Sequence, residues 1–186
     1  MHSLRIFYCS VLIVLCFSPV PASAQADSKA TGNPPADSWK ITADRIDPAN
    51  YYGITVANGM IGLVSSPEPM KVKDVVLNGA YDNYLRGRVS NILKGFNFVN
   101  MYLDVDGRRI GRRDIRDYRQ TLDMRQARLT TTFEVGDQLS VSHSVMALRH
   151  LPYCALSIVE LKATKDVTVT PASVIEAPEM LQDVRN

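Results

Sequence analysis

The chain of 186 residues has few cysteines, few histidines and little net charge. Two of its three cysteines, Cys9 and Cys16, lie in an apolar N-terminal segment, which leaves Cys154 alone in the remainder. A single cysteine excludes an internal disulfide, so the stability of this remainder must come from packing. The formal net charge is +2, which gives no global attraction for nucleic acid or for an anionic membrane.

Motifs of the common catalytic classes are also absent. The sequence contains no Gly-x-Ser-x-Gly, no Walker A motif and no Gly-x-Gly-x-x-Gly, so it has none of the motifs of α/β-hydrolases, P-loop enzymes or dinucleotide-binding enzymes. His143 and His150 lie seven residues apart, whereas metal-binding pairs on one strand usually lie two apart, on the same face. His143 belongs to the apolar set of its strand, and we interpret it as a core or interface histidine.

Glycoside hydrolysis normally requires two carboxylates that flank the scissile bond of a sugar. The glutamates of this chain are scattered along it: Glu68, Glu134, Glu160, Glu176 and Glu179. None has a sequence context that indicates a pocket, and we expect Glu134 and Glu160 to be solvated residues at strand ends. The sequence therefore predicts no catalytic residue, no cofactor-binding residue and no metal ligand.

The first 24 residues have the pattern of a secretory signal peptide. Arg5 precedes an apolar run at residues 6–17, and Ala22-Ser23-Ala24 forms a small-x-small cleavage site. The apolar run is too short to span a membrane. Residues 25–38 are polar and rich in turn formers, and we expect a disordered tether there. The sequence thus predicts a secreted or periplasmic protein with one folded domain at residues 39–186.

Beyond Trp39 the sequence alternates between short apolar runs and turn signals. The strongest signals are three pairs that tolerate positive φ: Asn58-Gly59, Asn78-Gly79 and Asp106-Gly107. The first of them predicts a type I′ hairpin turn. Residues 139–145 alternate between an apolar set that includes His143 and a set of serines, which is typical of a half-buried strand. Because no segment has a convincing helical period, we predict an all-β protein, an antiparallel β-sandwich.

Two more runs near the C-terminal end complete this pattern. Residues 153–163 are predicted to form a strand, and residues 167–170 are predicted to pair back on it through a turn at Lys165-Asp166. Within the first run we expect Cys154 to be a buried strand thiol rather than a nucleophile.

The most conspicuous charge feature is an arginine-rich run at residues 108–128. It holds eight arginines: Arg108, Arg109, Arg112, Arg113, Arg116, Arg119, Arg125 and Arg128. A nucleic-acid groove is one interpretation. The predicted export and the interleaved Asp114, Asp117 and Asp123 favour a solvated or interdomain face instead. Since guanidinium groups pair well with carboxylates across interfaces, we expect this run to lie at or near a face that packs on a partner domain.

Four segments together resemble one protein family. They are residues 54–62, 76–82, 118–129 and 141–149, and they include Asn58-Gly59-x-x-Gly62 and Leu122-Asp123-Met124-Arg125. Their order and spacing are similar to those of the N-terminal domain of glycoside hydrolase family 65, over residues 39–180. That family contains maltose, trehalose and kojibiose phosphorylases and related α-glucoside hydrolases. It usually has a glycine where this chain has Ala127.

The resemblance implies a β-sandwich of the galactose-mutarotase-like type. In the family this sandwich precedes an (α/α)6 barrel, which carries the catalytic acid and the site for phosphate or water. We expect this chain to stop before such a barrel, so no catalytic residue is carried over from the family. We therefore expect an accessory domain, a fragment that is inactive alone and whose partner is the catalytic barrel of an enzyme acting on α-glucosides.

Predicted export favours a hydrolase over a phosphorylase, because free phosphate and sugar phosphates are better used inside the cell. The main alternative is a stand-alone secreted module that binds carbohydrate or another protein. An independent small enzyme is a third interpretation, which no constellation of residues supports. We expect α-linked glucosides as ligands, no nucleic-acid partner and no membrane span.

Overall fold

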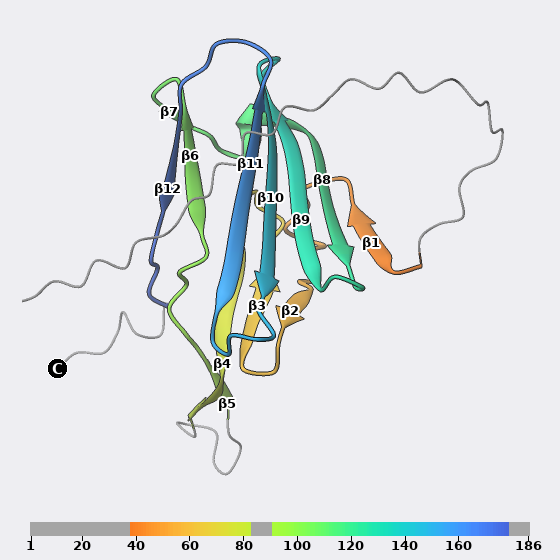
Figure 1. The fold of residues 1–186 in the computed structure, drawn as a ribbon, viewed down its shortest axis with the longest axis vertical. Helices are drawn as coiled ribbons and strands as arrows, with labels where there is room; N and C mark the ends of the chain where they lie inside the picture. The colour runs from red at the N-terminus through yellow and green to blue at the C-terminus, as the bar shows by residue number, and fades with distance from the viewer. Residues whose placement is uncertain (1–37, 83–90, 179–186) are drawn as a thin grey trace, which may run out of the picture. The chain divides into compact units, whose positions relative to one another are not determined.

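The computed structural model describes residues 38–82 and 91–178, which belong to one compact unit, Asp37–Asn186. These residues form strands and one short 3-10 helix (Figure 1). In chain order the elements are β1 (Lys40–Ala43), β2 (Thr55–Ala57), β3 (Ile61–Ser65), β4 (Val72–Asp82), β5 (Asn91–Lys94), β6 (Met101–Val105), β7 (Arg108–Arg109), η1 (Arg112–Asp114), β8 (Ile115–Asp123), β9 (Arg128–Val135), β10 (Leu139–Ala147), β11 (Ala155–Ala163) and β12 (Val169–Ser173). The described part of the chain contains no helix long and apolar enough to cross a membrane.

The strands form three antiparallel sheets. The large sheet has the order β1-β8-β9-β10-β11, and the two small sheets have the orders β2-β3-β4-β5 and β12-β6-β7. Figure 1 shows β8, β9, β10 and β11 side by side. The predicted all-β class with antiparallel strands is confirmed.

Two hydrophobic clusters show how the sheets pack. The first joins Leu129 and Val145 of the large sheet to residues of β2, β3 and β4, including Leu63. The second joins Phe133 of the large sheet to Leu103 of β6. The two small sheets therefore cover the same face of the large sheet, one toward each end of its strands, and this arrangement is a β-sandwich.

Strands β9 and β10 both have a period of two, which the sequence predicted for residues 139–145 in β10. In β9 every second residue from Leu129 is buried, and the residues between are half-buried. In β10 the buried set contains His143 and the apolar residues that alternate with serines, as predicted. Of the serines, Ser140 and Ser142 are half-buried, but Ser144 is buried, at 6% exposure. The alternation arises because successive side chains of a strand point to opposite faces of the sheet. This pattern places one face of each strand against the small sheets.

The Asp-Gly and Asn-Gly pairs form different turns. Asp106 and Gly107 both have positive φ, of 50° and 78°, as a type I′ turn requires, so the predicted turn between β6 and β7 is confirmed. At Asn58-Gly59 only the glycine has positive φ, at 90°, and the predicted type I′ turn is wrong. There the Asn58 side chain accepts the backbone N–H groups of Met60 and Ile61, each at 2.9 Å, which makes an Asx turn between β2 and β3.

Two other local predictions are also wrong. Asn78-Gly79 is not a turn, because β4 continues through it, and the pairing of β4 with β5 shifts register between Val76 and Tyr81. Gly79, with φ at 90°, lies within this irregular stretch. Residues 167–170 do not pair back on β11. Instead β12 pairs with β6 in the other layer, where Val169 packs against the second hydrophobic cluster.

Candidate functional site

A row of buried polar side chains crosses the inner face of the large sheet between the two hydrophobic clusters. Gln120 on β8, Thr131 on β9 and His143 on β10 are register partners on adjacent strands, and all three are buried. The amide of Gln120 donates to the Ser66 carbonyl at 2.9 Å and to the Thr131 hydroxyl at 3.1 Å. This row is satisfied by contacts within the fold, so we assign it to structure rather than to chemistry.

Two tyrosines lie close to this row. The Tyr51 hydroxyl is 2.5 Å from Oε1 of Gln120 and 2.6 Å from Oγ of Ser65, and burial raises the pKa of Tyr51. The Tyr118 hydroxyl is buried and has no hydrogen-bond partner in the described part of the chain. Burial, followed by the neighbouring Tyr51, raises the pKa of Tyr118. Both groups are therefore protonated at neutral pH and neither is a base.

The two histidines of the described residues, His143 and His150, differ in burial. His143 is 3% exposed and its Nε2 atom lies 2.9 Å from the Ser157 hydroxyl on β11. Burial lowers the pKa of His143 to about 4, so the imidazole is neutral at pH 7. His150 is exposed in the loop that follows β10. The prediction of a core histidine is confirmed, and the described residues contain no group of three His, Cys, Asp or Glu side chains that could hold a metal ion.

The Cys154 thiol is exposed, so the prediction of a buried strand thiol is wrong. Cys154 precedes β11 and closes a loop, in which its carbonyl accepts the N–H of Leu148 at 3.0 Å and its N–H donates to Leu151 at 3.2 Å. The strand therefore begins at Ala155, two residues after its predicted start at residue 153. The apolar composition of residues 153–163 concealed this boundary.

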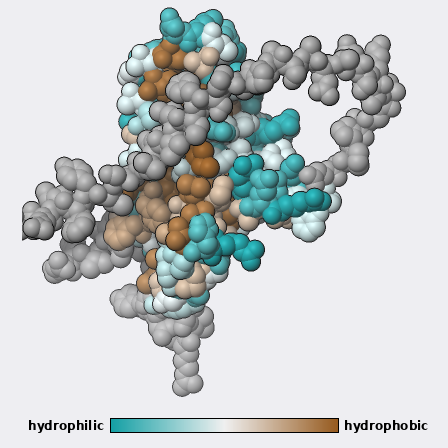
Figure 2. All heavy atoms as spheres, in the orientation of Figure 1, coloured by the Kyte–Doolittle hydropathy of each residue, from teal (hydrophilic) through white to brown (hydrophobic). Residues whose placement is uncertain are grey.

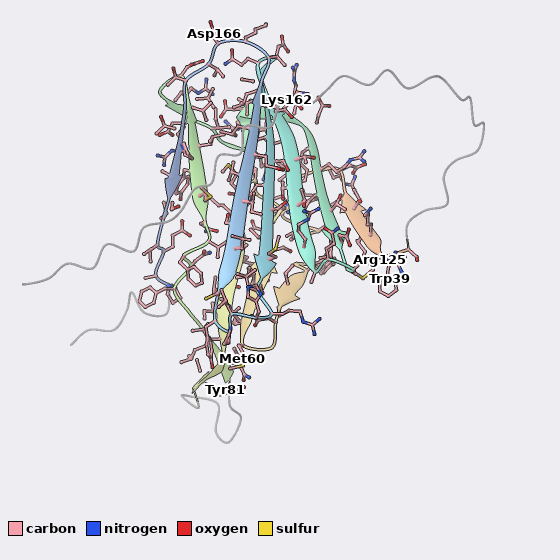
Figure 3. All side chains as sticks on the ribbon, in the orientation of Figure 1. Trp39, Met60, Tyr81, Arg125, Lys162 and Asp166 are labelled. Carbon is pink, nitrogen blue, oxygen red and sulfur yellow. The ribbon has the colours of Figure 1, made fainter. Side chains whose placement is uncertain are left out.

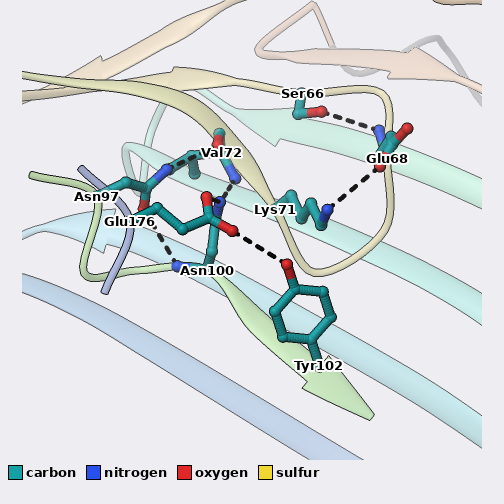
Figure 4. A network of polar contacts seen from close by, with 8 residues as sticks. All are labelled: Ser66, Glu68, Lys71, Val72, Asn97, Asn100, Tyr102 and Glu176. Carbon is teal, nitrogen blue, oxygen red and sulfur yellow. Dashed lines mark hydrogen bonds and ion pairs between the residues drawn. The ribbon is translucent and has the colours of Figure 1, made fainter. Parts of the chain in front are cut away.

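The glutamates are distributed over different parts of the fold. Glu134 on β9 is half-buried and Glu160 on β11 is exposed, and their strands are separated by β10. Glu179 lies outside the described residues. Glu68 and Glu176 appear together in Figure 4, in a region that sequence reasoning did not single out.

Glu176 holds the segment after β12 against two other strands. Its carboxylate accepts hydrogen bonds from the Asn100 amide at 2.6 Å and from the Tyr102 hydroxyl at 3.1 Å. Asn100 in turn accepts the Val72 N–H at 2.8 Å, and Asn97 donates to the Val72 carbonyl at 3.0 Å. The network joins β4, β6 and the C-terminal segment (Figure 4). Because its members are far apart in sequence, no local motif indicates it.

Tyr102 also contributes to the lining of a pocket of about 220 Å³. Its apolar lining consists of Pro69, Met70, Met101, Leu103, Ile110 and Phe133. Its polar lining consists of Glu68, Lys71, Tyr102, Arg109, Gly111 and Arg112. The Lys71 ammonium and the Arg109 guanidinium lie 5.1 and 4.5 Å from the centre of the Tyr102 ring, within reach of cation–π attraction.

The arginine-rich run is spread over several elements rather than one face. Three of its arginines pair within the chain, Arg108 with Asp114, Arg109 with Asp104 and Arg116 with Asp137. Arg109 holds the pKa of the Asp104 carboxyl below its usual value, and Arg116 does the same for Asp137. By contrast, Arg112 and Arg113 on η1 are exposed and form no ion pair with any described residue.

A different surface feature runs along β11. This strand ends the large sheet, and its side chains Leu156, Ile158 and Leu161 are 38%, 37% and 40% exposed. Figure 2 shows hydrophobic residues gathered down the middle of the drawn face, where β11 lies. Trp39 and Arg125, labelled at one end of the large sheet in Figure 3, form a separate stacked pair with 5.5 Å between guanidinium and ring centre. An edge strand with apolar side chains on both faces is typical of a strand that another element covers.

Comparison with known proteins agrees with the family resemblance of the sequence. Residues 53–184 match the family model described as glycosyl hydrolase family 65, N-terminal domain. The chain is 54% identical over 150 residues to a kojibiose hydrolase of Mucilaginibacter mallensis and 46% identical over 150 residues to a kojibiose hydrolase of Flavobacterium johnsoniae. In both cases the alignment covers 81% of this chain and 22% of the relative. The chain thus spans about a fifth of the length of these relatives.

Proposed function

The chain belongs to glycosyl hydrolase family 65 through its N-terminal domain, and from this premise we propose that it serves an exported enzyme that hydrolyses α-linked glucosides such as kojibiose. In this proposal the chain is an accessory domain. It releases no sugar by itself and acts by binding the catalytic (α/α)6 barrel. The observation that carries the proposal is 54% identity to a kojibiose hydrolase over a stretch that makes up 22% of that enzyme.

The carboxylates of the described residues support the inactivity of the chain alone. Glu176 is engaged by Asn100 and Tyr102, and Glu134 and Glu160 lie on strands separated by β10. Glu134 and Glu160 are therefore not on neighbouring strands, and the Glu176 carboxylate is already engaged within the fold. A hydrolytic site built from carboxylates on both sides of a sugar therefore requires groups from a second domain.

The surface supports association with such a domain. The exposed apolar side chains of β11 form an edge that would be covered in a larger assembly. Arg112 and Arg113 supply positive charge that no described carboxylate neutralises, as expected for one side of an interdomain contact.

Export rests on the sequence of residues 1–24, which lie outside the described part of the chain. Their basic, apolar and small-x-small order is that of a secretory signal peptide. Hydrolysis rather than phosphorolysis agrees with export and with the names of the two relatives. Detection of the mature chain in the periplasm or medium, with an N-terminus at Gln25, tests this part of the proposal.

The enzymatic part is tested by complementation in trans. We define the downstream region as the part of the Mucilaginibacter mallensis enzyme that follows the matched stretch. Kojibiose hydrolysis is measured with this chain alone, with the downstream region alone and after co-expression of both. We expect no glucose from the chain alone and more glucose after co-expression than from the downstream region alone. Glucose release by the repurified chain alone, or no effect of co-expression, contradicts the proposal. Kojibiose binding by the chain without any partner would favour the stand-alone module instead.

A further inference from the structure

The pocket beside Tyr102 combines an apolar floor with a positively charged rim. Met70, Leu103 and Phe133 are buried parts of the second hydrophobic cluster, so the floor belongs to the rigid core of the fold. The rim carries three cationic side chains, Lys71, Arg109 and Arg112, and one carboxylate, Glu68. A ligand that fits both parts must have an apolar group and at least one negative charge beside it.

The cations of the rim differ in how strongly they are already engaged. Arg109 forms two hydrogen bonds with Asp104, at 2.6 and 3.3 Å, and Lys71 lies 3.6 Å from Glu68. Arg112 has no such partner among the described residues and is exposed on η1. Arg112 is therefore the rim cation that is free to pair with an incoming carboxylate.

The size and lining of the pocket argue against a sugar. Its volume of about 220 Å³ is below the range of ~300–1,000 Å³ that small-molecule sites usually have. Lys71 and Arg109 both lie over the Tyr102 ring, which leaves it poorly suited as a stacking platform for a pyranose. One large apolar side chain suits this volume, as the anchor residues of protein interfaces do.

We propose that this pocket is the anchor point for the catalytic partner, and that it receives an apolar side chain of the downstream region flanked by carboxylates that pair with Arg112. The inference rests on the proposed function, because it locates the contact that the proposed association requires. We assign the downstream region as the occupant of the pocket because of the length of the relatives, which have most of their chain outside the 22% that matches here. The assignment follows also from charge, since the rim is complementary to an acidic segment.

The inference is tested by competition for a preformed complex. The parent chain is co-expressed and purified with the downstream region, and the parent chain in this complex carries a fluorescent label. Unlabelled chains then compete with the labelled parent chain for the downstream region. Arg112→Glu reverses the free rim charge, Arg112→Lys keeps it, and Gly111→Leu adds bulk to the pocket lining. An ideal Cβ at Gly111 meets no atom closer than Asp114 Oδ2 at 3.6 Å, so the backbone accommodates a side chain. Arg149→Glu is the matched charge reversal, at an exposed arginine in the loop that follows β10. That loop lies at the opposite end of β10 from Leu139, which belongs to the cluster of the pocket floor.

We expect Arg112→Glu and Gly111→Leu to compete at least about tenfold more weakly than the parent, since a close charge pair across an interface is worth ~1.5 kcal/mol or more and ~1.4 kcal/mol is a factor of ten. Arg112→Lys should lose less than Arg112→Glu, and Arg149→Glu should compete like the parent. Unchanged thermal unfolding midpoints show that the variants remain folded. If the parent complex forms but both pocket variants compete like the parent, the pocket is not the anchor and the proposed function stands. If no parent complex forms, both proposals fail.

Discussion

Replacement of Gln120 by leucine is predicted to lower the free energy of unfolding strongly, because the Gln120 amide is hydrogen-bonded to three other groups in the interior. Gln120 is 4% exposed, and leucine has a similar number of side-chain heavy atoms. The glutamine amide joins the Ser66 carbonyl, the Thr131 hydroxyl and the Tyr51 hydroxyl. Leucine leaves these three groups without that partner in the interior of the sandwich.

The size of the loss in free energy of unfolding follows from the hydrogen-bond partners that the three groups keep. The Tyr51 hydroxyl keeps Ser65 at 2.6 Å. Among the described residues, no side chain other than Gln120 is hydrogen-bonded to the Ser66 carbonyl or to the Thr131 hydroxyl. Each buried polar group left unpaired costs ~1–3 kcal/mol. With a partial offset from the added apolar contact, the free energy of unfolding should fall by ~2–4 kcal/mol.

Urea unfolding followed by tryptophan fluorescence and circular dichroism measures this change. With a denaturant slope of ~2 kcal/mol per molar urea, the midpoint should fall by ~1–2 M. Gln126→Leu is the matched control, because Gln126 is exposed in the turn between β8 and β9 and only its backbone N–H is bonded, to Asp123. Equal midpoints for the two variants would refute the structural role of the buried polar row.

Three further predictions concern single sites. Ala127 has φ at 49°, so Ala127→Gly should raise the free energy of unfolding by ~0.5–1 kcal/mol in urea melts, whereas Ala57→Gly in β2 should lower it. Tyr118→Phe removes a buried hydroxyl without a described partner and should leave the melting temperature equal or higher. His143 has its pKa lowered to about 4 by burial, so the unfolded chain binds more protons than the folded chain between pH 6.5 and 4. Stability should therefore fall by up to ~3 kcal/mol as pH drops through that window. His143→Gln should lose this dependence, and His150→Gln should keep it.

Much of the fold could be predicted because the period of two is a local property of the sequence. Burial on β9 and β10 follows directly from their alternation. The type I′ turn at Asp106-Gly107 was predictable for the same reason, since both residues tolerate positive φ. At Asn58-Gly59 the same signal failed, because the Asn58 side chain bonds to the backbone that follows and selects another turn. Pairing of β12 with β6 was not predictable, since it is decided by packing against a distant cluster.

The candidate site could not be found from local patterns. The Glu176 network and the neighbouring pocket combine residues from the loop before β4, from β6, from η1 and from the segment after β12. The arginine run did indicate an electrostatic surface, but three of its members are neutralised within the chain. Sequence alone could not separate them from Arg112, because ion pairing depends on which aspartates the fold brings near. At Ala127, where the resemblance implied a glycine, φ is 49°, a conformation that glycine adopts without strain.

We propose that the chain works by binding the catalytic part of a family 65 hydrolase. Sedimentation velocity of the purified chain, of the downstream region and of their co-expressed mixture measures this association. We predict a single 1:1 complex in the mixture, and a complex that weakens as salt is raised, because exposed charges contribute to the contact. Two independently sedimenting species at every salt concentration would contradict the account.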